Sequence, residues 1–272
     1  MTLVVSWIGK DTHGYTSAYI ASDSRVSWGN LNFYDSCRKT FFSNEFPDII
    51  GFCGDVLFPS MVIPSIIELI DKKILYDEND GPRTRFDKFK KKLIEEIKHY
   101  PKSEILNSFE ILYICRDIIE KGYPDFYAYK FIWKKDKSYQ VKALKLPVIS
   151  GLIDVMGSGA SDFNREYGGR IKGLNANTTR NVFHTFSVVL EKMTDKKSGG
   201  VAQLVGLYRK PEKSGFAFGI LHKRNRYYNG MRISFSENID VIEWRNRNFE
   251  ICSGRIRKRK SYAKEQSIDT TI

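Results

Sequence analysis

The stretch TLVVSWIGKDTHGYTSAYIASDSR, residues 2–25, decides the fold predicted for this chain. It contains two runs rich in apolar and β-branched residues, 2–8 and 15–21, and the intervening GKDTHG has the composition of a turn. This pattern predicts a β-hairpin that begins with the first residues of the chain. Thr2 opens the first predicted strand, and Asp23-Ser24-Arg25 follows the second.

Beyond this hairpin the chain alternates between strand and helix patterns. Strands are predicted at 49–53, 109–115, 126–133, 139–144, 201–208 and 216–221. Helices are predicted at 62–70, at 86–97, after residue 159, and at 182–193. In 126–133 both alternating sides are largely apolar, which is typical of a sheet covered on both faces. Helix pairs between antiparallel hairpins predict an α+β sandwich with the sheets inside and the helices outside.

The composition is that of a globular protein. Of the 272 residues, 42% are hydrophobic and 28% are charged, and the net charge of +12 permits acidic partners without naming one. The chain has no apolar run of about 18 residues and no basic segment before its first apolar run, which predicts a soluble, cytoplasmic protein with no membrane segment.

The cysteines and histidines form no recognisable ligand pattern. Cys37, Cys53, Cys115 and Cys252 are far apart in the sequence and include no CxxC pair, which predicts reduced, mostly buried thiols. None of the four histidines lies three to five residues from another His or a Cys. We therefore expect no metal site and no cofactor.

Thr2 acquires catalytic chemistry if Met1 is removed, a routine step when a small residue follows. Its hydroxyl is then a nucleophile, and its own α-amine, whose ordinary pKa is about 7.7–8.0, is a base on the same residue. A β-branched Thr is also an ordinary residue at the start of a strand. Thr2 alone therefore does not identify an enzyme.

Further blocks accompany Thr2 along the chain. In order they are Ala21-Ser22-Asp23-Ser24-Arg25, Lys39, Gly51-Phe52-Cys53-Gly54, Met156-Gly157-Ser158-Gly159 and Asp195-Lys196-Lys197-Ser198-Gly199-Gly200. Each block is weak by itself, since short glycine-containing segments are common in turns. Their order and intervals, from residue 2 to about residue 221, resemble those of the β-type proteasome subunits and their bacterial relatives, which are N-terminal-nucleophile (Ntn) hydrolases.

The resemblance implies a fold and a reaction. The fold is a four-layer αββα sandwich of antiparallel sheets flanked by helices. Thr2 Oγ attacks the scissile carbonyl, and its α-amine accepts the proton directly or through a water. Lys39, held in an ion pair by Asp23, lies beside the hydroxyl and lowers the cost of forming the alkoxide. Lysine is more often a surface residue, which is the alternative reading of Lys39.

The resemblance also assigns supporting roles. Ser158, Asp195 and Ser198 are expected to hydrogen-bond the Thr2 amine and fix its position. The backbone N–H of Gly54 is the expected oxyanion donor, although a glycine at the end of a strand is ordinarily a turn residue.

An apolar specificity pocket is expected beside the nucleophile. Its walls are Cys37 and Phe41 on either side of Lys39, and Phe52 and Val56 on either side of Gly54. Core packing explains the same four residues, and this alternative remains open.

The sequence departs from the family pattern in two places. The loop 10–15 lengthens the interval between Thr2 and Asp23 by about five residues. This extends the first hairpin at its turn without moving Thr2 and Asp23 at the opposite ends of the two strands. The stretch 223–272 has no counterpart, so the expected organisation is an Ntn-hydrolase domain at 1–222 and, at 223–272, a C-terminal extension with a strand-like part and a basic tail. Nucleic-acid binding is one interpretation of the basic tail, and a solvated, mobile tail is the preferred one.

The resemblance implies a threonine-type endopeptidase that hydrolyses polypeptide in a homo-oligomeric assembly, with an ATP-dependent unfoldase as a partner that it allows. Two alternatives remain. One is an Ntn amidohydrolase acting on a small amide. The other is a noncatalytic proteasome-like shell or binding subunit, against which the retention of Lys39 with Asp23 argues.

Overall fold

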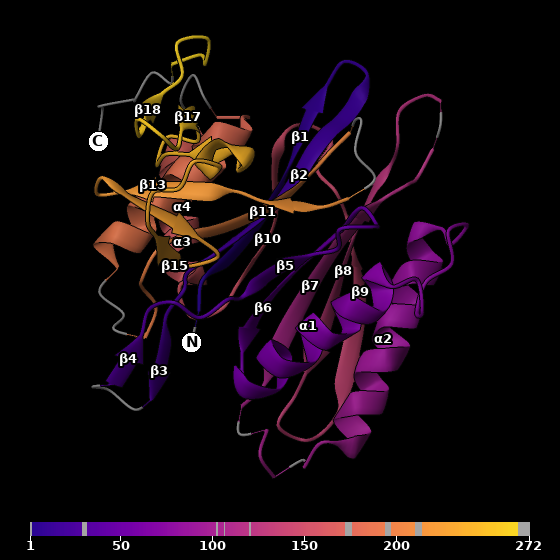
Figure 1. Cartoon of the computed structure of the whole chain (residues 1–272). Helices are drawn as coiled ribbons and strands as arrows, with labels where there is room; N and C mark the ends of the chain where they lie inside the picture. The colour runs from indigo at the N-terminus through magenta and orange to yellow at the C-terminus, as the bar shows by residue number, and fades with distance from the viewer. Residues whose placement is uncertain are drawn as a thin grey trace.

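The computed structural model describes residues 2–28, 32–101, 103–105, 107–119, 121–171, 176–193, 197–209 and 214–265. This part of the chain contains four α-helices together with sheets whose strand pairs are antiparallel with one exception. Figure 1 shows these helices as two pairs on opposite sides of the molecule, with sheets between the pairs. No described helix is both long enough and apolar enough to cross a membrane.

The first sheet contains the predicted N-terminal hairpin. Its order is β10 (Gly151–Met156), β1 (Val4–Asp11), β2 (Gly14–Ser22), β11 (Gln203–Tyr208) and β12 (Phe216–Ala217). The hairpin prediction is confirmed, and the added loop residues lie at its tip, where Asp11 pairs with Gly14. Strand β10 was not predicted, because Asp154 interrupts its short apolar run.

The second sheet contains the predicted meander. Its order is β5 (Thr40–Phe42), β6 (Asp48–Gly54), β7 (Phe109–Arg116), β8 (Phe126–Trp133) and β9 (Tyr139–Leu144). Strand β8 is covered on both faces as predicted, since Ala128 packs toward the first sheet and Tyr129 packs toward the helices. A separate two-stranded hairpin, β3 (Val26–Trp28) with β4 (Asn32–Tyr34), lies between β2 and β5 in the chain.

Three hydrophobic clusters join these elements. Val4 and Ile20 of the first sheet pack with Ile49 and Leu112 of the second. A second cluster joins the second sheet to α1 (Leu57–Asp71) and α2 (Pro82–His99), and a third joins the first sheet to α3 (Ala160–Arg170) and α4 (Thr179–Lys192). The four predicted helices are confirmed, and α1, α2 and α4 each begin several residues before the predicted apolar pattern.

Two buried contacts fix the helices that cover the second sheet. The isoleucines of α1 at 63, 66, 67 and 70 pack into the molecule itself and present no apolar face to a partner. In α2, Arg85 Nε lies 3.2 Å from Asp48 Oδ1, and both side chains are buried. This ion pair ties α2 to the start of β6.

The described part of the C-terminal extension, residues 223–265, is folded. Together with β13 (Gly219–His222), which precedes it, it builds a third sheet in the order β15 (Met231–Ile233), β14 (Asn225–Tyr228), β13, β16 (Trp244–Arg245), β17 (Ile251–Ser253) and β18 (Lys258–Arg259). The predicted boundary at residue 222 falls in the turn between β13 and β14. The basic segment was expected to be mobile, and this was wrong for its first part, because β18 pairs with β17, and Cys252 of β17 packs in a small buried cluster with Trp244.

The strand predicted at 216–221 is two strands in two sheets. Residues 216–217 form β12 and pair with β11, whereas 219–222 form β13 and pair with β14 and β16. The chain changes sheet at Gly219, where a Cβ would lie 2.4 Å from the Trp244 ring. A continuous apolar pattern does not reveal such a change of partner.

Candidate active site

The predicted site lies at one end of the first sheet. Val4 of β1 pairs with Ser22 of β2 and with Met156 of β10, and Ser22 also pairs with Gln203 of β11. Residues just before β1, just after β2 and just after β10 therefore lie side by side. These residues include Thr2, Asp23 and Gly157.

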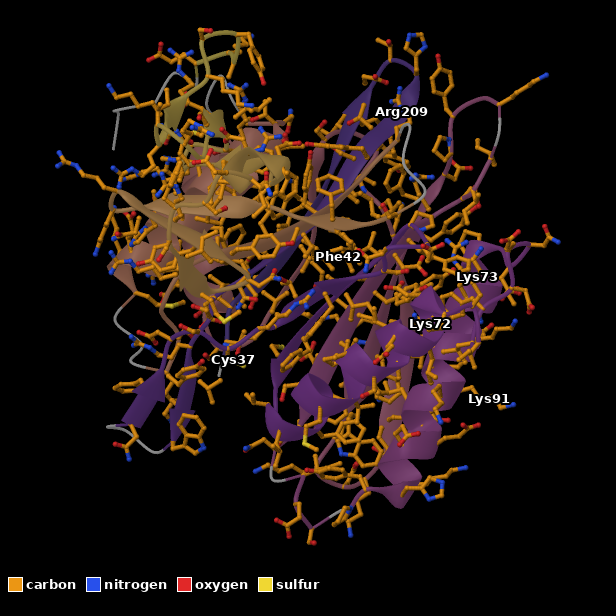
Figure 2. All side chains as sticks on the ribbon, in the orientation of Figure 1. Cys37, Phe42, Lys72, Lys73, Lys91 and Arg209 are labelled. Atoms are coloured by element: carbon orange, nitrogen blue, oxygen red, sulfur yellow. The ribbon has the colours of Figure 1, made fainter. Side chains whose placement is uncertain are left out.

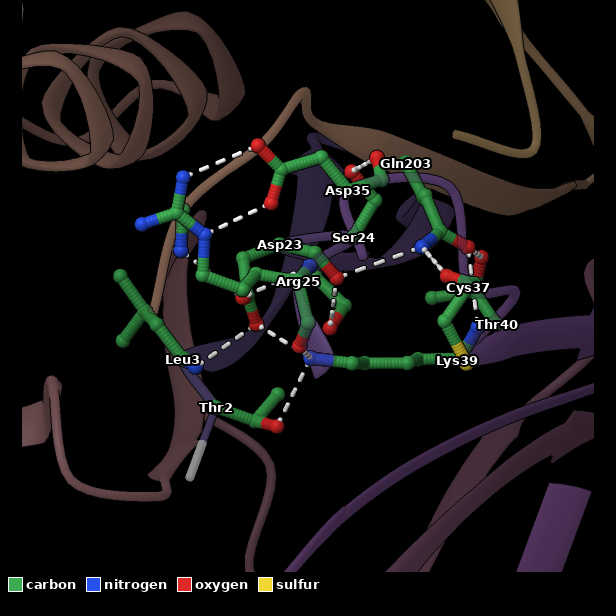
Figure 3. A network of polar contacts seen from close by, with 12 residues as sticks. Thr2, Leu3, Asp23, Ser24, Arg25, Asp35, Cys37, Lys39, Thr40 and Gln203 are labelled. Atoms are coloured by element: carbon green, nitrogen blue, oxygen red, sulfur yellow. Dashed lines mark hydrogen bonds and ion pairs between the residues drawn. The ribbon is translucent and has the colours of Figure 1, made fainter. Parts of the chain in front are cut away.

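Lys39 reaches this end from the second sheet. It immediately precedes β5, and its side chain extends toward Thr2 and Asp23 (Figure 3). Its Nζ donates to Thr2 Oγ1 at 2.9 Å, to Asp23 Oδ1 at 3.1 Å and to the backbone carbonyl of Arg25. Each ammonium proton thus has an acceptor, and the side chain is fully buried. The surface alternative for Lys39 is excluded.

The Asp23 carboxylate is held by more than the lysine. Its Oδ1 also accepts from the Leu3 N–H at 3.1 Å, and its Oδ2 accepts from the backbone N–H groups of Arg25 at 3.2 Å and Gly199 at 3.1 Å. Four donors therefore surround this one buried carboxylate. The bond from Leu3 ties this carboxylate to the residue after Thr2.

The glycine blocks have a packing explanation. Gly157 has φ +90, and a Cβ on it would lie 1.8 Å from the Thr2 carbonyl oxygen. Gly199 would meet Arg25 at 2.7 Å, and Gly200, with φ +75, would meet Ser24 Oγ at 2.4 Å. At these positions the backbone approaches the site too closely for any side chain. The blocks that suggested the family therefore lie against Thr2 and against the Asp23–Arg25 segment.

The contacts of Gln203 and the ion pair of Arg25 were not predicted from the sequence. The Gln203 side chain is fully buried, and its Nε2 donates to the carbonyls of Asp23 at 3.2 Å and Cys37 at 2.6 Å. Its Oε1 accepts from the backbone N–H of Lys39 at 3.0 Å. Arg25 forms a two-point ion pair with Asp35 (Figure 3). A polar residue within the apolar run 201–208 was the available signal for Gln203.

The remaining polar residues assigned to the site differ from one another in their placement. Ser198 is buried and directly precedes Gly199, whose N–H contacts Asp23. Ser158 follows Gly157 and is exposed. Asp195 lies outside the described residues.

Gly54 ends β6 with φ +97. A Cβ there would lie 2.2 Å from the Ser108 carbonyl oxygen and 2.7 Å from Phe109 Cα. Close packing of its own neighbouring strand therefore explains the glycine. The oxyanion role of its N–H stays a prediction.

Three of the four residues expected to wall a pocket pack in or against the hydrophobic core, as the alternative reading had it. Phe41 and Phe52 are buried in the cluster under α1 and α2, with ring centroids 6.2 Å apart, and Val56 is half-buried against the same cluster. Cys37 is half-buried, and its carbonyl and N–H bind Gln203 and Ser24.

The cysteines near the site are poor nucleophiles. Burial raises the pKa of the Cys37 thiol above its ordinary value, and burial raises the pKa of Cys53 to about 12. Both thiols are therefore protonated near neutral pH, whereas a reactive cysteine needs its thiolate. Among the described residues, no group of three or more His, Cys, Asp and Glu side chains is arranged to hold a metal ion.

Comparisons with known proteins find similarity in structure but not in sequence. No protein-family model matches the sequence, and no curated protein matches it. Among solved structures, the chain is similar to eukaryotic HslV from Trypanosoma brucei, with 12% identity and a TM-score of 0.46. The match covers 75% of this chain and 99% of that chain. The roles of the site residues therefore have to follow from their own contacts.

Proposed function

We propose that this chain is a threonine-type endopeptidase of the Ntn-hydrolase class, with Thr2 as the nucleophile after Met1 is removed. The observation that supports this best is the buried Lys39 ammonium, which donates to both the Thr2 hydroxyl and the Asp23 carboxylate. Burying a lysine is costly unless it is paired and hydrogen-bonded. A buried cation aimed at a hydroxyl is the arrangement that stabilises an alkoxide.

The proposed reaction uses the groups of Thr2 itself. Thr2 Oγ1 attacks the carbonyl carbon, and its proton passes to the α-amine that removal of Met1 frees. Lys39 stabilises the alkoxide that develops on Thr2 Oγ1. The protonated amine then donates its proton to the departing peptide nitrogen. Water hydrolyses the resulting ester and regenerates the hydroxyl. Thr2 is fully buried in this structure, so its hydroxyl has to become accessible before it can attack a substrate.

The finer assignments belong to the same proposal. We propose the four-layer αββα arrangement of a bacterial proteasome-related type, with the domain at 1–222 followed by the extension. Ser158, Asp195 and Ser198 support the amine, Gly54 donates to the oxyanion of the substrate, and the segments around Lys39 and Gly54 border the specificity pocket. A cytoplasmic location and an unfoldase partner complete the proposal.

The direct test combines mass measurement with chemical labelling. The purified protein is incubated with a peptide epoxyketone, which requires both the hydroxyl and the free amine of an N-terminal threonine for its double adduct. We expect the intact mass to show loss of Met1 and one adduct, located on Thr2 by peptide sequencing. A protein that retains Met1 and hydrolyses peptides, or that carries its adduct elsewhere, contradicts the proposal.

We also propose that the active form is a homo-oligomer of several subunits. The buried isoleucines of α1 leave its exposed Leu57 and Met61 as the apolar residues of that helix available to another subunit. Sedimentation velocity over a wide concentration range is expected to show a species larger than the 31.5 kDa chain. A fully active monomer at all concentrations contradicts this part of the proposal.

A further inference from the structure

The C-terminal extension reaches the candidate active site through a two-residue turn. Tyr228 of β14 pairs with Met231 of β15, and Asn229 and Gly230 connect them with φ values of 49° and 82°. Positive φ at both positions is typical of a type I′ turn, for which Asn-Gly is a preferred sequence. The hairpin therefore ends in a well-defined tip, at which Gly230 is buried.

This tip packs on the residues that surround Asp23 and Lys39. A Cβ placed on Gly230 would lie 2.8 Å from Ser24 Cβ, 3.3 Å from Gln203 Nε2 and 3.6 Å from the Cys37 carbonyl oxygen. The first distance is shorter than real side chains show, so nothing larger than glycine fits without a displacement. The backbone of the extension thus forms part of the wall around the site.

Gln203 connects this wall to the catalytic groups. Its amide joins three backbone positions: the carbonyl of Asp23, the carbonyl of Cys37 and the N–H of Lys39. The first lies at the end of β2, and the other two lie on the segment that leads into β5. The amide nitrogen that makes two of these bonds is the atom that Gly230 faces. Any shift of Gln203 therefore changes the distance between the end of β2 and the backbone of Lys39.

We propose that the Asn229-Gly230 turn is a positioning element of the Thr2–Asp23–Lys39 site. By packing on Ser24 and Gln203, the turn holds the Lys39 segment against the end of β2 and so sets where Lys39 Nζ meets Thr2 Oγ1. This inference rests on the proposed role of Thr2 and adds to it a role for the extension. A displacement of 1 Å in such a group costs about 10²-fold in rate.

The test compares two glycines with positive φ. Gly230→Ala introduces strain and a collision with Ser24. Gly14→Ala introduces strain alone, because Gly14 has φ +120 and nothing within 4 Å of its added Cβ. Gly14 lies at the far tip of the β1–β2 hairpin, where its carbonyl accepts from Arg209 Nη2 at 2.9 Å. Figure 2 shows Arg209 well separated from Cys37.

We expect Gly230→Ala to lower kcat on a peptide amide substrate by about 10- to 100-fold with little change in KM. Gly14→Ala should retain kcat even if it lowers the melting temperature as much as Gly230→Ala does. Equal kcat for the two variants, measured on folded protein, overturns the inference. If Gly230→Ala does not fold, Gln203→Met provides the second test, since it keeps the length of the side chain and removes all three bonds.

A second measurement does not depend on catalysis. The Lys39 amide proton is bonded to Gln203 Oε1, so its hydrogen exchange reports whether the link is intact. Gly230→Ala should accelerate this exchange, and Gly14→Ala should leave it unchanged. Faster exchange together with an unlabelled Thr2 in the native protein means that the mechanical link exists but the proposed function fails. A labelled Thr2 together with unchanged exchange and kcat means that the positioning role alone fails.

Discussion

Thr2→Ala is expected to lower peptide hydrolysis by at least about 10⁴-fold, which is the size of loss when an enzyme loses its nucleophile. The variant lacks Oγ1, the atom that accepts from Lys39 Nζ, and keeps Asp23 as the partner of that lysine. Thr2→Ser should keep part of the activity, because serine retains the hydroxyl and the amine and lacks only the methyl that restricts the rotamer. The measurement is hydrolysis of a fluorogenic peptide amide by preparations whose N-terminus has been checked by mass.

An uncleavable N-terminal extension is the matched control for these variants. It leaves Oγ1 in place and converts the Thr2 amine into a non-basic amide, which removes the proton acceptor. We expect its activity to fall to the level of Thr2→Ala. Hydrolysis at the native rate by the extended chain, or by Thr2→Ala, refutes Thr2 as the nucleophile. Turnover of small amides but not of peptides by the native chain would instead favour the small-amide alternative.

Lys39→Met is expected to lower kcat by about 10²–10³-fold, the loss typical of one donor that stabilises developing charge. It should also cost about 3–5 kcal/mol of folding free energy, because it leaves the Asp23 carboxylate buried without its cation. Lys39→Arg should recover much of the stability and little of the rate, since the planar guanidinium keeps the charge but changes the reach to Thr2 Oγ1. Denaturant unfolding and kcat per folded molecule, measured on the same samples, separate the two effects.

Arg85→Met is the matched control for the loss of stability. Arg85 and Asp48 form another fully buried ion pair, located between α2 and β6, and the variant removes its cation in the same way. We expect a similar loss of about 3–5 kcal/mol and an unchanged kcat in the folded protein. If Lys39→Met and Arg85→Met have equal kcat, the contribution of Lys39 is structural and not catalytic.

The elements that carry local patterns were predictable. Alternation in 126–133 and the spacing of the isoleucines in 63–70 depend on a few neighbouring residues. Strand β8 was therefore found at its observed bounds, and α1 was found as a helix although it begins at Leu57, before the predicted start at residue 62. Strand β3 has only three residues, too few for a pattern, and in β10 Asp154 interrupts the apolar run. The split of 216–221 between two sheets escaped prediction because both halves are equally apolar.

The candidate site was likewise predictable only in part. From the sequence, the family resemblance of the ordered blocks implied that Thr2, Asp23 and Lys39 lie together, and the tertiary structure places Thr2 Oγ1 and Asp23 Oδ1 within hydrogen-bond distance of Lys39 Nζ. Only the tertiary structure decided what surrounds them. Gln203 is 164 residues from Lys39, and the Gly230 turn comes from a segment with no counterpart in the family pattern. Contacts of this kind depend on strand register and on the packing of one sheet against another, which no local run of residues encodes.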